Sequence, residues 1–120
     1  MLDDIVRAEI REVVAVHGTY PLRFFSILDS SGSPSLDFET RNAEYDYIRA
    51  ETWHSLDLSD YRLWAYSDNA DLLWWNGDQT ILMDYRGSAF ISIGVRPSQF
   101  IRLVAMGKYA SFFPQDLLDP

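Results

Sequence analysis

The chain has 120 residues, which is long enough for one hydrophobic core and too short for two ordinary domains. Its content of 48% hydrophobic and 15% aromatic residues predicts a packed protein rather than a disordered acidic one. The net charge of −8 argues against nucleic acid or an anionic membrane as the ligand, because lysine and arginine bind phosphate groups. We therefore expect a single domain over residues 1–120.

The sequence carries no sign of export or of a membrane span. It has no cysteine, which excludes disulfides, thiolate catalysis and cysteine-ligated metal sites. The N-terminus reads Met1-Leu2-Asp3-Asp4, without the apolar run of a secretion signal. No stretch approaches the roughly 18 apolar residues that a membrane helix needs. These features predict a cytoplasmic protein.

The first predicted element is an N-terminal helix. Apolar residues recur at three- and four-residue steps from Leu2 to Val14, with charges between them. Asp3 or Asp4 is the predicted N-cap, His17 lies in the last turn, and Gly18 suits the position after the helix. The β-branched valines of the second half also allow the start of a strand.

The next segments are expected to form a strand, a loop and a return strand. Residues 20–28 are rich in aromatic and β-branched side chains, and residues 29–35 are turn formers. Residues 36–40 then alternate between apolar and polar side chains, as an antiparallel partner would. For residues 42–53 the sequence allows either a short helix capped by Asn42 or another strand.

The second half predicts an antiparallel meander. Short apolar runs separated by turn formers occupy residues 61–67, 71–75, 79–85 and 89–95. Asn76-Gly77 suits a two-residue type I′ turn, because both positions of that turn need positive φ. The fold class is therefore α+β, a mostly antiparallel sheet covered by an N-terminal and a C-terminal helix.

The C-terminal helix is predicted from its two ends. Arg96-Pro97-Ser98 places proline in the first turn, and Gly107 ends the helix. Residues 109–120 contain phenylalanines and leucines, which we expect to pack over the edge of the sheet.

Catalytic and metal-binding motifs are not evident. The acid pairs Asp57/Asp60 and Asp68/Asp71 have a three-residue spacing that arises by chance in acidic segments, and they lie in predicted turns. A metal cluster of His54 with the first pair is less favoured than a capping role. No Gly-x-Ser-x-Gly or phosphate-loop pattern occurs. We expect no enzyme activity, no metal and no cofactor.

The negative charge is concentrated between residues 37 and 84. This segment holds eleven acids and three arginines, whereas the rest of the chain holds seven acids and seven bases. It also contains all four tryptophans. Acidic side chains steer a basic partner, and aromatic side chains provide rigid contact area. The segment therefore predicts a surface that binds a basic protein.

The tryptophans differ in their predicted exposure. Successive residues of a strand point to opposite faces, so Trp74 and Trp75 cannot enter the same side of the sheet. The polar neighbours of Trp75 across the turn make it the predicted surface residue. Trp64 lies between two apolar residues and is predicted to belong to the core, whereas the sequence leaves the exposure of Trp53 open.

The order of short motifs in the second half carries a family resemblance. Tyr61–Asn69 is followed by Asp71–Trp74, then by an acidic strand and by the helical segment Pro97–Val104. In this order, residues 61–107 resemble the SUKH superfamily of bacterial immunity proteins. The resemblance implies a protein that binds and neutralises a cognate toxin, commonly a nuclease or a deaminase.

These observations predict a small inhibitory binding protein of the immunity type. It would occlude the active site of a basic toxin that acts on nucleic acid. The predicted partner-binding residues are Glu44, Tyr45, Asp46, Glu51, Trp53, Asp57, Asp60, Asp68, Asp71 and Trp75. Three alternatives stay open: a phage-encoded inhibitor of a host nuclease, a homodimeric scaffold or regulatory subunit, and a small-molecule binder with an apolar pocket.

Overall fold

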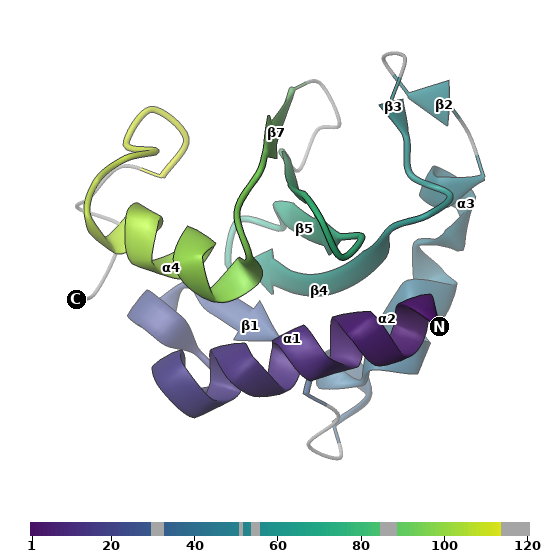
Figure 1. The fold of residues 1–120 in the computed structure, drawn as a ribbon, viewed down its shortest axis with the longest axis horizontal. Coiled ribbons are helices and arrows are strands. Elements are labelled where there is room, and N and C mark those ends of the chain that lie inside the picture. The colour runs from purple at the N-terminus through teal and green to yellow at the C-terminus, as the bar shows by residue number, and fades with distance from the viewer. Residues whose placement is uncertain (30–32, 51, 54–55, 85–88, 114–120) are drawn as a thin grey trace.

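The computed structural model of the chain has an α+β architecture, as predicted (Figure 1). It describes residues 1–29, 33–50, 52–53, 56–84 and 89–113. The helices are α1 (Leu2–His17), η1 (Pro21–Arg23), η2 (Pro34–Leu36), α2 (Phe38–Glu44), α3 (Asp46–Arg49) and α4 (Pro97–Ala105). The strands are β1 (Phe25–Ile27), β2 (Thr52–Trp53), β3 (Leu56–Asp57), β4 (Arg62–Ser67), β5 (Leu72–Trp75), β6 (Thr80–Met83) and β7 (Phe90–Ile93).

The main sheet of the described residues has five strands in the order β1-β4-β5-β6-β7, and all neighbours are antiparallel. The last four follow one another along the chain and form the predicted meander. β1 pairs with β4, at the edge of the meander away from β7, and there Ile27 pairs with Ala65. β2 and β3 form a separate hairpin that stands apart from the sheet (Figure 1). The irregular pairing between Leu63 and Ala65 marks a bulge in β4.

The helix α1 is continuous, so the predicted strand in its second half does not form. It buries Val6, Ile10 and Val13, which lie three or four residues apart on one face. The predicted aspartate cap is wrong, because the N-cap is Met1 and no side chain caps the helix. Gly18 has a φ of 83°, which suits glycine after the last turn, as predicted.

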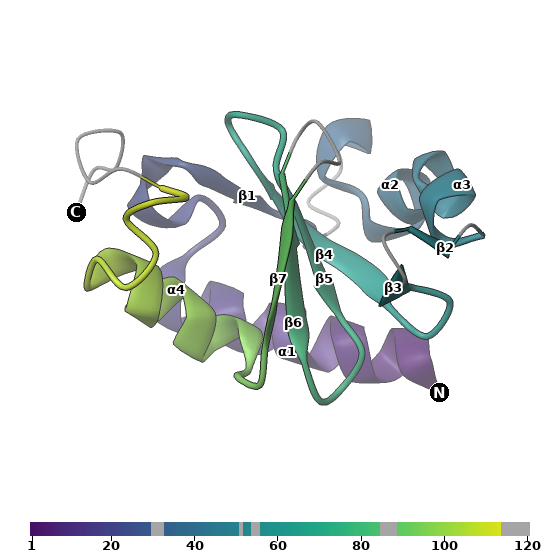
Figure 2. The same ribbon diagram turned by 90° about the horizontal axis from the view of Figure 1, so that it is seen from above.

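The helix α4 lies beside α1 on the same side of the sheet (Figure 2). It begins at Pro97 as predicted, and Gly107 follows its end with a φ of 85°. Side-chain hydrogen bonds join the helices: Arg96 donates to the buried Glu9 at 2.8 Å, and His17 donates to the carbonyl of Ser98 at 3.0 Å. Together the two helices close one face of the core.

An aromatic cluster attaches the segment after α4 to the sheet. Phe113 is 1% exposed, and its ring lies 5.1 Å from that of Phe25 in the edge strand β1. Phe100 of α4 contacts both rings edge to face. The predicted packing of the C-terminal segment over the sheet edge is confirmed as far as Phe113, and residues 114–120 lie outside the described residues.

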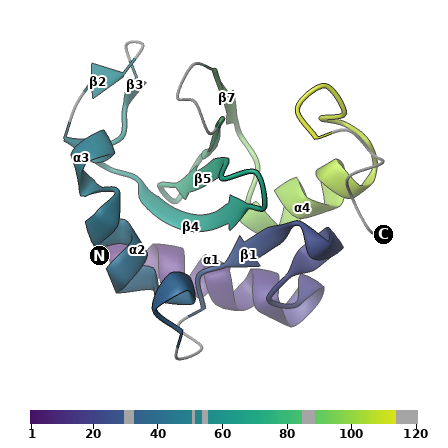
Figure 3. The same cartoon turned by 180° about the vertical axis from the view of Figure 1, so that it is seen from behind.

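The return strand expected over residues 36–40 does not form, because this segment enters the helix α2. Residues 46–49 form the helix α3, which agrees with the helical alternative left open for residues 42–53 (Figure 3). Asp37 caps α2 by accepting from the backbone N–H of Thr40 at 2.9 Å. Asn42 does not cap a helix: it lies inside α2, is buried, and bonds both backbone groups of Leu63 in β4. The alternating apolar and polar residues 36–40 therefore contain the N-cap and the first turn of α2, not a strand.

The turn between β5 and β6 is longer than predicted. Trp75 pairs with Thr80, so the loop has four residues instead of two. The side chain of Asn76 accepts from the backbone N–H groups of Asp78 and Gln79, at 2.8 and 2.7 Å. These bonds stabilise the wider loop and shift the register by two residues, which leaves each side chain on its predicted face.

The predicted exposure of Trp75 is wrong, because this residue is only 3% exposed. The expectation assumed that one face of the sheet is open to solvent, but every residue of β5 and β6 is buried. Leu58 and Tyr61, which lie between β3 and β4, belong to the same buried core. Trp64 and Trp74 are fully buried, as predicted for Trp64.

Candidate protein-binding surface

Acidic residues from four separate segments gather at one end of the molecule. In Figures 1 and 2 the start of α1, the helix α3 and the β2–β3 hairpin lie at the same end. The loop between β5 and β6 also reaches this end, because Gly77 lies against Ile5 of α1. We define the acidic end by its five carboxylates, Asp3, Asp46, Asp57, Asp60 and Asp78.

Two arginines hold the acidic end together. Arg49 donates to Asp46 at 2.7 Å and to the backbone carbonyl of Ser59 at 3.2 Å, which ties α3 to the segment after β3. Arg62 donates to Asp3 at 2.7 Å, which ties β4 to the start of α1. Burial and then the neighbouring charge of Arg62 lower the pKa of Arg49. Both guanidinium groups are therefore engaged within the surface.

Three carboxylates of the acidic end are left available for a partner. Asp57, Asp60 and Asp78 are exposed and form no ion pair with any residue that the structure describes. The backbone N–H of Ser59 donates to Asp57 at 2.9 Å, and this bond, followed by the Ser59 hydroxyl, lowers the pKa of Asp57. The Asp57 side chain is thus held as an anion and oriented from within the chain.

Tyr61 reports the negative potential at this end. Its ring belongs to the core, and burial is the main cause of its raised pKa. Asp78 and then Asp60 raise this pKa further, because both carboxylates disfavour the phenolate. The two acids come from different loops, and both lie close enough to Tyr61 to act on the same phenol.

Two tyrosines lie beside the acids at the corner between α2 and α3. Tyr47 is 63% exposed, which is high for a large aromatic side chain. Its ring lies 6.4 Å from that of the half-buried Tyr45. Glu44 is exposed in the same corner and pairs with Arg41 at 2.9 Å. The corner therefore combines exposed aromatic area with negative charge.

Two of the predicted binding acids do not join this surface. Asp68 and Asp71 belong to the turn after β4, at the far end of that strand from Arg62. Asp71 is 5% exposed and accepts from the hydroxyl of Ser67 at 2.7 Å. Asp68 accepts from the hydroxyl of Tyr20, and this bond is the main cause of the raised pKa of Tyr20. A buried Asp71 is unavailable to a partner, so its assignment to the surface was wrong.

The sequence prediction covers only part of the surface. Glu51 and the side chain of Trp53 lie outside the described residues, and the buried Trp75 cannot serve as an exposed anchor. Asp3, Asp78 and Tyr47 were missed. Asp3 lies far from the acidic segment in sequence, and only the folded contacts of α1 with the β5–β6 loop and with Arg62 bring it to this end.

Metal sites and membrane-spanning helices find no support in the described part of the chain. No group of three or more His, Cys, Asp or Glu side chains there is placed to hold a metal ion. His54 lies outside it. Among the described helices, none is long and apolar enough to cross a membrane.

The chain was compared with known proteins by sequence and by structure. No protein-family model, no curated protein and no solved structure matches it. The acidic end is therefore interpreted from its own geometry and charge.

Proposed function

We propose that the protein is an inhibitory binding protein, of the immunity or antitoxin type, that neutralises a basic partner acting on nucleic acid. The observation that carries this proposal is the convergence of five carboxylates from four segments at one end of the molecule. The proposed binding surface is the acidic end together with Glu44, Tyr45 and Tyr47.

The charge of this surface suits a protein whose active site binds phosphate. Such a site is lined by lysine and arginine, and an acidic surface attracts it over several ångströms. Arg49 and Arg62 are already paired, so they do not cancel the charge of Asp57, Asp60 and Asp78. Occlusion by a competing acidic surface requires no catalysis by the inhibitor itself.

The aromatic residues supply the affinity that surface charge alone lacks. Exposed charges mainly accelerate association and select the partner, whereas buried aromatic contacts slow dissociation. Tyr47 has the largest exposed aromatic surface of this corner, and the ring of Tyr45 lies beside it. Tyr47 replaces Trp75 as the proposed anchor. The resemblance of residues 61–107 to SUKH immunity proteins supports the same class of function.

The proposal is tested by capture of the partner from the native host with tagged variants. The test bait carries Asp46→Asn, Asp57→Asn and Asp60→Asn, which remove three charges from the acidic end. The matched control carries Glu12→Gln, Glu39→Gln and Asp68→Asn, which change the net charge equally outside it. We expect the parent and the control to capture the same basic protein, and the test bait to lose it.

The captured protein then allows a sharper measurement. Its association rate with the parent chain should fall steeply as salt rises, whereas Tyr47→Ala should mainly speed dissociation. A partner without nuclease or other nucleic-acid activity contradicts the proposed target class. Equal capture by the test bait and the control shows that the acidic end is not the binding surface.

A further inference from the structure

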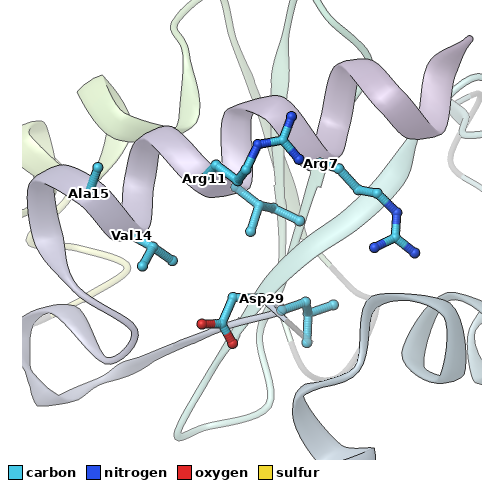
Figure 4. Close-up of a pocket in the computed structure, with 7 residues that line it drawn as sticks. Arg7, Arg11, Val14, Ala15 and Asp29 are labelled. Atoms are coloured by element: carbon cyan, nitrogen blue, oxygen red, sulfur yellow. The ribbon is translucent and has the colours of Figure 1, made fainter. Parts of the chain in front are cut away.

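A groove lies on the side of α1 that faces away from α4, and none of its lining residues belongs to the acidic end. It lies between α1 and the chain just after β1, and its volume is about 370 Å³ (Figure 4). The helix contributes Arg7, Ile10, Arg11, Val14 and Ala15, whose spacing places them on one face. Leu28 and Asp29 form the opposite wall. This volume lies at the lower end of the range of small-molecule sites, roughly 300–1,000 Å³.

The floor of the groove is apolar. Ile10 and Leu28 are almost completely buried, and Val14 is half-buried between them and solvent. A small aliphatic group placed here would pack against Val14 and the remaining exposed edges of Ile10 and Leu28. Burial of apolar surface would therefore favour its binding.

The two arginines at the groove differ in their availability. The guanidinium of Arg7 stacks over the ring of Phe38 at 4.6 Å and pairs with Glu39 at 3.3 Å. Arg11 is exposed, and it forms no ion pair or hydrogen bond with any residue in the described ranges. Arg11 is thus the positive group that is free to meet an anion.

The carboxylate of Asp29, in contrast to Arg11, would be stabilised by a positively charged group. Within the described residues its side chain accepts no hydrogen bond, and its Oδ1 atom is shielded from water. A partly desolvated carboxylate without a donor is costly, and a cation beside it would offset this cost. Asp29 and Arg11 project from opposite walls and do not pair with each other (Figure 4).

We propose that this groove binds a small aliphatic α-amino acid. The ligand's carboxylate pairs with Arg11, its ammonium lies against the carboxylate of Asp29, and its side chain covers Ile10, Val14 and Leu28. An aliphatic acid without the ammonium leaves Asp29 without a donor, and an aliphatic amine leaves Arg11 without an anion. Only a ligand with both charges and an aliphatic group matches all three features. The proposal does not depend on the function of the acidic end.

The test is a titration of the full chain with L-leucine, followed by NMR at Ile10, Val14 and Leu28. Isocaproate and isoamylamine serve as matched probes that lack the ammonium and the carboxylate. We expect saturable shifts with L-leucine and an affinity about tenfold lower or worse for each analogue, since each loses a charge-assisted contact. Arg11→Gln and Asp29→Asn should weaken L-leucine binding to a similar extent.

Arg102→Gln, at an exposed arginine of α4 outside the groove, is the control and should bind L-leucine like the parent. Arg11 is exposed, so its replacement leaves the fold intact, as circular dichroism will verify. Absence of saturable shifts with L-leucine overturns the proposal. So does unchanged binding in Arg11→Gln, or equal affinity for L-leucine and both analogues, which would indicate only apolar contact.

Discussion

Burial assigns Trp75 to the core, and its replacement should therefore reduce stability. The residue is 3% exposed at the end of β5, in a strand that is buried throughout. We expect Trp75→Ala to lower the free energy of unfolding by about 3–5 kcal/mol, because truncation removes apolar contacts and leaves a cavity. Urea denaturation measures this change. Tyr47→Ala, at an exposed ring, should change stability by no more than about 0.5 kcal/mol.

Tyr61 provides a residue-scale measure of the potential at the acidic end. Its pKa is raised by burial first and then by Asp78 and Asp60. We expect Asp78→Asn to lower the pKa of Tyr61 part of the way towards its ordinary value, because burial remains. NMR titration of the ring resonances measures this pKa, and Glu12→Gln is the control that should leave it unchanged. An unchanged pKa in Asp78→Asn would contradict the described position of the β5–β6 loop.

The raised pKa of Tyr61 also fixes the sign of its effect on stability. The pKa is higher in the folded than in the unfolded chain, so folding favours the neutral phenol. This contribution is fully present below the unfolded value near pH 10 and is lost as pH rises through the folded value. Unfolding by alkali should therefore occur at a higher pH in Tyr61→Phe, which has no phenol to ionise.

At the scale of elements, one amide joins α2 to the sheet. β1 pairs only with residues Ala65 to Ser67, so at Leu63 β4 pairs with β5 on one side and has no strand on the side of β1. There the side chain of Asn42 accepts from the Leu63 N–H at 2.7 Å and donates to its carbonyl at 3.0 Å. It donates to the carbonyl of Phe38 as well. The amide thus replaces the missing strand and fixes the position of α2.

Removal of the Asn42 amide should lower the free energy of unfolding more than removal of the Asp37 cap of the same helix. Asn42→Ala leaves the buried N–H and C=O of Leu63 without partners, so we expect a loss of about 2–4 kcal/mol in unfolding free energy. Asp37→Ala removes the N-cap of α2 and should cost only about 1 kcal/mol. Chemical denaturation of both variants gives the comparison. If Asn42→Ala proves the milder change, the described clamp is incorrect.

Local signals explain which elements the sequence predicts. The turn formers of the second half and the proline and glycine at the ends of α4 act within a few residues, and the strands and helix they predict are present. The register of β5 and β6 was missed, because the side chain of Asn76 stabilises a longer loop. The burial of Trp75, the approach of Gly77 to Ile5 and the ion pair of Asp3 with Arg62 depend on contacts between distant segments, which a local sequence pattern does not contain.

The charge of the whole molecule is unevenly placed. The acidic end combines five carboxylates with two paired arginines. Around the junction of α1 and α4, Arg96 and Arg102 lie beside Glu12. Like charges held close together destabilise a folded protein, although they accelerate the encounter with a partner of opposite sign. A binding role for the acidic end therefore implies that its charges reduce stability.

This implication predicts how stability responds to salt and to charge removal. Added salt screens the repulsion, so we expect the thermal midpoint of the parent to rise between low and physiological ionic strength. Asp60→Asn removes an unpaired charge and should raise the midpoint at low salt by about 2 °C, while reducing its dependence on salt. Calorimetry measures both the midpoint and its dependence on salt. Glu12→Gln, beside two arginines, is the control, and it should neither raise the midpoint nor reduce its salt dependence. A lower midpoint for Asp60→Asn would mean that the carboxylate stabilises the fold, and the acidic end would then serve structure rather than recognition.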